Sequence, residues 1–412
     1  MLAVASGWAL APVVGWLINE GRQIGEPTQL TDELCRRLVE EGVPLWRLRF
    51  SFQTLHPQVA ACAFTWTRAQ NSTESCLLHG IPDSEAFFGN PIGGADATEG
   101  AAQCRIEHLD PELHQMTVLG GIDYLVAPFT FSTGQANAFI VATDHPGGFS
   151  DTDAAKFQTL TAFLAPILEV IAVRRIARTL LDTYVGHRTG GKVLDGRIKR
   201  GDGETIHAAL WFSDLRDFTR LSETLPPDRL LAMLNAYFEL LAEAVTGHGG
   251  EVLRFVGDAM LVLFPVELGD DVHLACSAAL DAALDAFQNL ARLNDVRLKE
   301  GEPPIRFGVG LHVGKVIYGN VGSPDRLDFT VMGPAVNRAA RIEGLTKALG
   351  VPLLFSADFA AQVTPPARSL GHHRLKGVAE PQEVLTLTEE LSRFVEPGDK
   401  AADGVAGRIA LN

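Results

Sequence analysis

Two apolar runs meet at Gly257 and Asp258 in the stretch EVLRFVGDAMLVLF (251–264). A Gly-Asp pair between such runs predicts a β-hairpin whose tight turn carries the Asp258 carboxyl group at its tip. Upstream, the apolar stretch AALWF (208–212) predicts another strand, and Asp214 stands just past its end. If the hairpin lies beside this strand, the two carboxyl groups face each other at one end of a sheet.

Two carboxylates so close together repel each other unless cations bridge them. Magnesium, which proteins hold with few carboxylates plus substrate phosphates, meets that requirement. Phe218 and Thr219 stand near the start of the next predicted helix, where unpaired backbone amides attract phosphate. The simpler interpretation is that Asp214 caps this helix and that Asp258 only makes a turn.

A helix is predicted over the stretch that begins at Pro226 and ends at Gly247. Its apolar residues recur on one face, as in an amphipathic core helix: Leu230, Leu234, Phe238, Leu241 and Val245. This helix returns the chain to the hairpin. From residue 208 onward, strands and helices alternate as in a mixed α/β domain.

The N-terminal half has a different pattern. An amphipathic helix is marked by Leu30, Leu34 and Leu38 and stops at Gly42. Four strands and a long helix (151–185) follow, the strands being expected at 47–55, 60–68, 123–131 and 136–144. This layout resembles a GAF-like α+β sensor module, although no residue pattern names its ligand or signal. The alternative is a domain that serves only to dimerise the protein.

The size of the chain agrees with two domains. Its 412 residues are 46% apolar and 8% aromatic, enough to bury more than one core. Gly and charged residues concentrate at 186–205, as in a connector between domains. We therefore predict a GAF-like sensory or dimerisation domain, a helical and Gly-rich connector, a second domain and a flexible tail, over residues 1–175, 176–205, 206–390 and 391–412.

The charge and the cysteine content limit which partners the protein is expected to bind and in which cellular compartment it is expected. With 35 basic and 50 acidic residues the net charge is −15, which disfavours nonspecific binding to nucleic acid or to an anionic membrane. The apolar segment Met1 to Ile18 lacks the basic start of a signal peptide and is interpreted as a buried helix, not a membrane anchor. Five cysteines without CxxC spacing predict reduced thiols in the cytoplasm, neither a disulfide framework nor a zinc site: Cys35, Cys62, Cys76, Cys104 and Cys276.

Three motifs together carry a family resemblance. In this order and spacing, the chain contains FSDLRDFT (212–219), GGEVLRFVGDAML (249–261) and FTVMGPAVNRAARIE (329–343). They resemble the catalytic domain of class III adenylate and guanylate cyclases over about residues 205 to 390. Three separated motifs are far more specific than a single one. The resemblance implies a ferredoxin-like α/β catalytic domain, so that the whole chain is expected to be α+β.

The resemblance also implies roles for individual residues. Asp214 and Asp258 match the family's metal-binding carboxylates, which would hold two Mg²⁺ or Mn²⁺ ions ~3.5–4 Å apart. Asn337 and Arg341, four residues apart on one helix face, match the Asn that orients the ribose and the Arg that stabilises the transition state. Lys376 matches a lysine that reaches the terminal phosphates of the substrate.

Base choice depends on two further positions. In this family a Lys at the position of Arg254 and an Asp or Thr at the position of Thr330 usually read adenine, whereas guanylate cyclases tend to have Glu and Cys. Thr330 therefore favours ATP, because its hydroxyl group accepts a hydrogen bond from the adenine amino group. Arg254 departs from the usual Lys but keeps a donor and a positive charge. Asp217 also departs, since many relatives have Gly there; its carboxylate either alters metal affinity or faces solvent.

The family resemblance thus predicts an adenylate cyclase that makes cyclic AMP and pyrophosphate from ATP under control of the N-terminal domain. Its active sites are expected at the subunit interface of a homodimer, because in the family the metal carboxylates and the Asn/Arg pair come from different subunits. A guanylate cyclase and a catalytically silent nucleotide-binding regulator are the alternatives.

Overall fold

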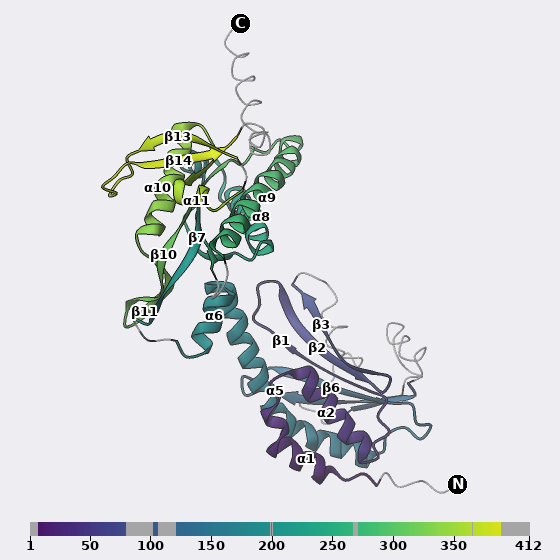
Figure 1. The fold of residues 1–412 in the computed structure, drawn as a ribbon. Coiled ribbons are helices and arrows are strands. Elements are labelled where there is room, and N and C mark those ends of the chain that lie inside the picture. Colours follow the sequence, from purple (N-terminus) through teal and green to yellow (C-terminus); the bar gives the residue numbers. More distant parts are fainter. Residues whose placement is uncertain are drawn as a thin grey trace. The chain divides into compact units, whose positions relative to one another are not determined.

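The computed structural model describes residues 7–79, 102–105, 121–197, 199, 201–266, 271–364 and 366–388 (Figure 1). The chain forms two compact units, Met1–Leu180 and Leu181–Asn412. Helix α5 (Asp151–Val185), which the sequence predicts over the same residues, contributes to both units. The predicted tail at 391–412 lies outside the described residues.

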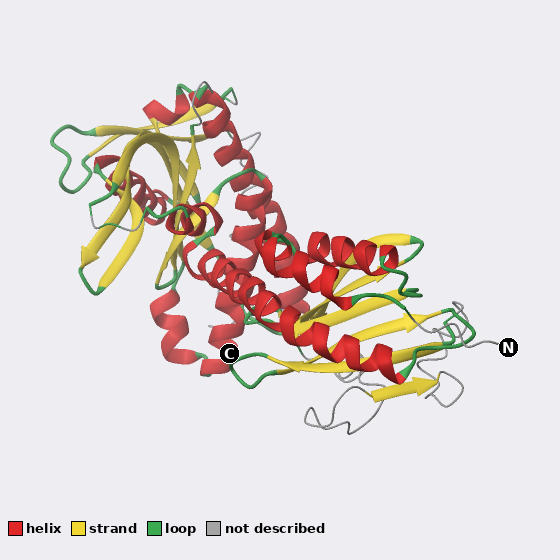
Figure 2. Ribbon diagram, turned by 90° about the horizontal axis from the view of Figure 1, so that it is seen from below, coloured by secondary structure: helices red, strands yellow, loops and turns green. Residues whose placement is uncertain are grey.

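The first unit is a six-stranded antiparallel sheet with helices on one face (Figures 1 and 2). Besides α5, the helices among the described residues of this unit are α1 (Leu10–Asn19), the 3₁₀ turn η1 (Gly21–Gln23) and α2 (Pro27–Glu40). In sheet order the strands are β3 (Gln70–Leu78), β2 (Val59–Thr67), β1 (Arg47–Gln53), β6 (Ala136–Thr143), β5 (Asp123–Thr130) and β4 (Ala102–Arg105). The four predicted strands are present, whereas β3 and β4 were not predicted.

The apolar N-terminal segment contributes to the core of this unit. Val13, Trp16 and Leu17 of α1 are buried, which agrees with a buried helix for this part of the segment. Just before α1, the indole Nε1 of Trp8 donates to Oδ1 of Asp153 at 2.6 Å, so that the segment is fastened to the start of α5. Burying an indole N–H group with an acceptor avoids the cost of leaving that donor unpaired.

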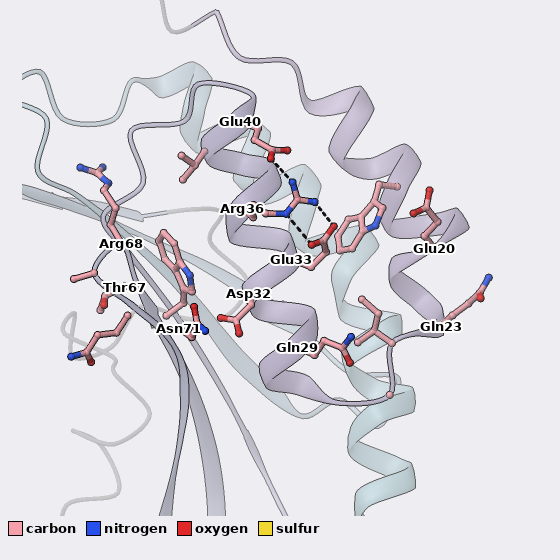
Figure 3. Close-up of a pocket in the computed structure, with 17 residues that line it drawn as sticks. Glu20, Gln23, Gln29, Asp32, Glu33, Arg36, Glu40, Thr67, Arg68 and Asn71 are labelled. Atoms are coloured by element: carbon pink, nitrogen blue, oxygen red, sulfur yellow. Dashed lines mark hydrogen bonds and ion pairs between the residues drawn. The ribbon is translucent and has the colours of Figure 1, made fainter.

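A hollow of about 1160 Å³ opens between α1, α2 and the β2–β3 turn (Figure 3). Charged and aromatic side chains line it, and several charges are already paired within it. Arg36, for example, forms ion pairs with Glu33 and with Glu40 along α2. The hollow is therefore polar and open, not a closed apolar cavity.

The second unit is built on an eight-stranded sheet in the order β13-β14-β12-β10-β7-β9-β8, with β11 paired to β10. All neighbouring strands are antiparallel except β10 and β12. The strands are β7 (Gly203–Leu215), β8 (Glu251–Val256), β9 (Ala259–Pro265), β10 (Phe307–Ser323), β11 (Arg326–Met332), β12 (Leu353–Ser356), β13 (Ala367–His373) and β14 (Gln382–Leu387). The helices are α6 (His187–Leu194), α7 (Phe218–Thr224), α8 (Pro227–Gly247), α9 (Val272–Lys299), α10 (Pro334–Leu349) and α11 (Ala357–Ala360).

Helices cover both faces of this sheet. One face packs against α8 and α9 through residues such as Trp211 and Val262, and the other packs against α10 through Leu210 and Leu261. By length and composition alone, α8 is the one described helix that could cross a membrane. Its residues Met233, Tyr237 and Leu241, among others, are buried in the core, as expected of a core helix.

Glycines of β10 let α10 lie unusually close to the sheet. A Cβ atom on Gly310 would lie 2.4 Å from the backbone nitrogen of Glu343 and 2.5 Å from the carbonyl oxygen of Ala339. A Cβ on Gly314 would lie 2.9 Å from the Cβ of Ala335. Since real Cβ atoms do not approach backbone atoms so closely, these positions fix the height of α10 above the sheet.

Candidate active site

Asp214 and Asp258 meet at one end of the second sheet, as the sequence predicts. In the register of the strands, Asp214 of β7 stands opposite Ala259 of β9 and Gly308 of β10. Asp258 directly precedes Ala259 in the β8–β9 turn. The two carboxyl groups lie within hydrogen-bond reach of each other, and the hydrogen bond forms while one of them carries a proton.

The electrostatics of this pair reflect the lack of a positive charge. The pKa of Asp258 is raised to about 6, chiefly by burial and then by the hydrogen bond and negative charge of Asp214. Two carboxylates in contact destabilise each other's ionised form, and a divalent cation removes that cost.

Glu343 is a third acidic side chain at this place, and the sequence analysis did not single it out. It lies on α10 and is only 5% exposed. Its pKa is raised to about 7, chiefly by burial and also by the charge of Asp214, while the charge of Arg216 opposes the shift. An Nη1 atom of Arg216 lies 3.9 Å from Glu343 Oε1, and Thr346 Oγ1 lies 3.2 Å from the same oxygen.

The sequence does contain a pattern that could have identified Glu343 as a site residue. Ala335, Ala339 and Ile342 mark the sheet-facing side of α10 at helical spacing, and Glu343 lies on that side. A carboxyl group on the apolar side of a helix is costly unless its surroundings need it. Glu343 is also the last residue of the third motif, so its place on this side of the helix pointed to the carboxylate cluster.

Asn337 and Arg341 lie on the other side of α10. Both are exposed, whereas the helix buries Ala335, Ala339 and Glu343 against the sheet. Four residues correspond to about one helical turn, so the two side chains project from one face, as predicted. That face is opposite to the one that meets Asp214 and Asp258. Within a single chain the structure therefore does not bring the two predicted pairs together.

The two base-reading candidates lie on neighbouring structural elements. Arg254 of β8 forms an ion pair with Asp328 of β11, and Thr330 follows two residues later on the same face of that strand. Arg254 and Asp328 are both about half exposed, with side-chain exposures of 45% and 42%. Asp328 is a second residue that the sequence analysis did not name, and it decides where the guanidinium group of Arg254 lies.

The phosphate-binding candidates are spread more widely. Phe218 is the first residue of α7 and packs against the core, and Thr219 beside it is exposed. Lys376 is exposed in the turn between β13 and β14, and no hydrogen bond or ion pair links it to Asp214 or Asp258 in the described part of the chain.

The structure settles where the Asp217 side chain points. An Nη2 atom of Arg306 lies 2.8 Å from Oδ2 of Asp217, and Lys347 Nζ lies 4.0 Å from Oδ1. Its backbone is left-handed, with φ of 60°, unlike any other non-glycine residue in the described ranges. This conformation explains why Gly suits the position, and it shows that the carboxylate is engaged by cations of its own chain.

Comparisons with known proteins decide the family of this unit. Residues 203–357 match the model of the adenylate and guanylate cyclase catalytic domain. The C-terminal half contains a class III cyclase catalytic domain. The cyclase domain is 35% identical over 172 residues to adenylate cyclase 1 of Rhizobium meliloti and 37% identical over 173 residues to an adenylate cyclase of Anabaena cylindrica.

These matches cover 40% and 41% of the chain, but only 25% and 33% of the two relatives' own lengths. Among solved structures, a bacterial light-regulated adenylyl cyclase is 31% identical, with a TM-score of 0.40, and covers 47% of this chain and 97% of the other. The comparisons identify the C-terminal domain and leave the first unit unassigned.

The chemistry of the donor set fits divalent metal ions. Asp214 and Asp258 offer carboxylate oxygens close to each other, and each raises the electrostatic cost of ionising the other. Hard oxygen donors are those that Mg²⁺ and Mn²⁺ prefer. The two side chains are therefore suited to hold the metal that this family uses.

Proposed function

We propose that the chain is an adenylate cyclase that converts ATP to 3′,5′-cyclic AMP and pyrophosphate. The observation that carries the proposal is the contact between Asp214 and Asp258, at the end of the sheet of a cyclase domain. An apolar or amide pair at this position would stabilise the fold better than two carboxyl groups. The carboxylate pair with its raised pKa therefore points to a functional role.

Each residue has a place in the reaction. Asp214 and Asp258 would hold two Mg²⁺ or Mn²⁺ ions, which when bound would lower the pKa of the ribose 3′-hydroxyl and neutralise the triphosphate. The 3′-oxygen attacks the α-phosphorus in line, and pyrophosphate leaves. Asn337 orients the ribose, and the guanidinium group of Arg341 stabilises the charge that grows on the α-phosphate oxygens. Phe218, Thr219 and Lys376 are proposed to contact the phosphates through backbone amides and the ammonium group.

A homodimer with shared sites is part of the proposal. Arg341 is exposed on the side of α10 that faces away from the carboxylates, so a second chain is the natural source of the Asn337–Arg341 pair for each site. Two symmetric sites follow from a twofold axis. A single chain alone should then be inactive.

The choice of ATP over GTP rests on Thr330 and Arg254. Thr330 accepts a hydrogen bond from the adenine 6-amino group, whereas guanine has a carbonyl oxygen there. Asp328 neutralises part of the charge of Arg254 and holds its guanidinium group near the edge of β11. The guanidinium group then donates to adenine N1 from a fixed position.

Turnover with ATP and with GTP, in Mg²⁺ and then in Mn²⁺, tests this proposal, with cyclic product and pyrophosphate measured together. Cyclic AMP from ATP alone is the expected result. Cyclic GMP would keep the reaction and reject the assignment of the base pocket. No product from either nucleotide, with ATP still binding, would favour a silent nucleotide-binding regulator.

Asp258→Ala tests the metal assignment. The residue lies in a turn and not in the core, so the variant should fold and lose at least ~10²-fold in kcat. Asp325→Ala, an exposed residue of the β10–β11 turn, is the matched control and should keep its activity. Equal turnover of the Asp258 variant and the wild type would reject the two-metal mechanism.

Regulation is proposed to come from the first unit, which we interpret as a GAF-like sensor in the cytoplasm. Its hollow between α1, α2 and the β2–β3 turn gives a small molecule a place to bind (Figure 3). Since α5 belongs to both units, a ligand that favours one state of the first unit would act on the cyclase domain through this helix. Nucleic acid and membrane are not among the proposed partners.

A further inference from the structure

The first unit contains a pair of thiols that the sequence separates by 14 positions. Cys62 of β2 and Cys76 of β3 stand directly opposite each other in the antiparallel register. Their Sγ atoms lie 2.8 Å apart. They meet because the β2–β3 hairpin folds the chain back on itself, and both are free thiols in this structure.

We propose that Cys62 and Cys76 are a modification site, at which a low-molecular-weight disulfide converts them reversibly into a cross-strand disulfide. Opposed residues of an antiparallel pair have Cβ atoms ~4.5–5.5 Å apart or slightly less, close to the span of a disulfide. The bond therefore needs only small side-chain movements. This inference does not depend on the proposed cyclase activity.

A metal site is the competing interpretation. Glu74 lies beside the two cysteines, and the three side chains are the one described group of three possible metal ligands close to one another. Two thiolates on one tetrahedral zinc ion, with Zn–S bonds of ~2.3 Å, would lie ~3.8 Å apart. The observed sulfur separation is shorter than that. Glu74 is also engaged already, because Arg175 Nη2 lies 2.5 Å from its Oε1 atom.

The two cysteines differ in a way that gives the reaction an order. Cys76 is exposed, whereas Cys62 is only 4% exposed and burial raises its thiol pKa. The Cys76 thiolate therefore attacks an oxidised disulfide first, forming a mixed disulfide and releasing one reduced thiol. Cys62 then loses its proton and attacks the Cys76 sulfur, which releases the second thiol. Two protein S–H bonds are lost, one S–S bond forms, and the reagent is reduced to two thiols.

The site lies where β3 contacts α5. Cys76 Sγ donates to Glu74 Oε1 at 3.7 Å, and the same oxygen accepts from Arg175 of α5. The Arg175 guanidinium also lies over the ring of Phe64 on β2, with its carbon 5.5 Å from the centroid. Oxidation removes the S–H donor from Glu74 and ties β3, an exposed edge strand, to β2. The contact of β3 with α5 is therefore expected to become firmer.

The test measures which cysteines of the full chain can be alkylated, which we call a thiol map. The protein is incubated in glutathione buffers with an increasing oxidised fraction, quenched with acid, unfolded and alkylated. The expected result is the loss of two alkylatable thiols per chain and a peptide pair joined through Cys62 and Cys76, both restored by reductant. Hydrogen exchange in β3 and near Arg175 should slow in the oxidised protein. Cys76→Ser should abolish the cross-link, and the buried Cys35→Ser, a matched control, should leave it unchanged.

Three results would overturn the proposal. The first is a wild-type map in which both thiols stay reduced at every buffer ratio. The second is a cross-link of Cys76 to Cys104 or to a second chain. The third is one zinc ion bound per chain by the reduced protein, lost in Cys62→Ser and Cys76→Ser alike, with no cross-link formed. The map of the wild-type protein can refute the proposal without any variant, so the test remains valid even if a variant misfolds.

Discussion

The buried carboxyl group of Glu343 should make the metal-free protein less stable as pH rises. Its pKa moves from the usual 4.5 to about 7 in the folded chain. Between these values the folded protein keeps a proton that the unfolded chain has released, so stability is full below pH ~4.5 and falls until the pH passes ~7. Since one pH unit is worth ~1.4 kcal/mol, the loss reaches at most about 3 kcal/mol.

Glu343→Gln removes this titration while keeping the size of the side chain. The expected result is a flatter dependence of unfolding free energy on pH, and a variant more stable than the wild type at pH 8. The remaining slope comes from other groups with shifted pKa values. Asp258, whose pKa is raised to about 6, and Glu251, whose pKa is also raised, lower stability as pH rises, whereas His312, whose pKa is lowered to about 4, has the opposite effect. Glu239→Gln, on the exposed side of α8, is the matched control and should follow the wild-type curve.

The assay is urea unfolding of the full chain from pH 5 to pH 8, with a chelator and then with excess Mg²⁺. Metal binding by Asp214 and Asp258 replaces the missing positive charge, so Mg²⁺ should restore more stability at pH 8 than at pH 5. Parallel pH curves for wild type and Glu343→Gln in chelator would refute the reasoning. They would mean that the carboxyl group is already ionised at pH 5 and held by Arg216.

Three further predictions concern the cyclase domain. Gly310→Ala should destabilise the domain by ~1–3 kcal/mol, because the new methyl group meets the α10 backbone. Gly344→Ala, the control, should not destabilise it, because nothing lies within 4 Å of the new Cβ atom. Equal melting temperatures of the two variants would contradict this prediction. Asp328→Asn should change the ratio of kcat/KM for ATP and GTP while leaving the fold intact, and an unchanged ratio would remove Asp328 from the base pocket. Asp214→Ala and Arg341→Ala chains, each inactive alone, should regain part of their activity when mixed, and no recovery would place both residues of a site in one chain.

The sequence was most informative where chemistry and local pattern coincide. The hairpin of residues 251–264 was predicted from its Gly-Asp turn, and the predicted helix at 151–185 has the same bounds in the structure. Strand β3 was missed because QNSTESCLL is a polar edge strand, so it lacks the apolar alternation that marks a half-buried strand. Local pattern reveals a strand only when one of its faces is buried.

The residues missed in the sites depend on contacts between distant parts of the chain. Asp328 was not singled out because its importance comes from the ion pair with Arg254, on a strand that precedes it by more than seventy positions. The Cys62–Cys76 contact requires the register of two strands, one of which was not predicted. Glu343 could have been found from its place on the apolar side of α10.

The left-handed backbone of Asp217 has a consequence for the loop between Asp214 and α7. Aspartate loses less backbone entropy on folding than glycine would, but its Cβ atom adds strain in this left-handed conformation. The contact with Arg306 holds the residue in that shape in the folded protein. In the proposed cyclase, this loop would keep its shape without a bound nucleotide, and less of the binding energy of the nucleotide would be consumed in ordering the loop.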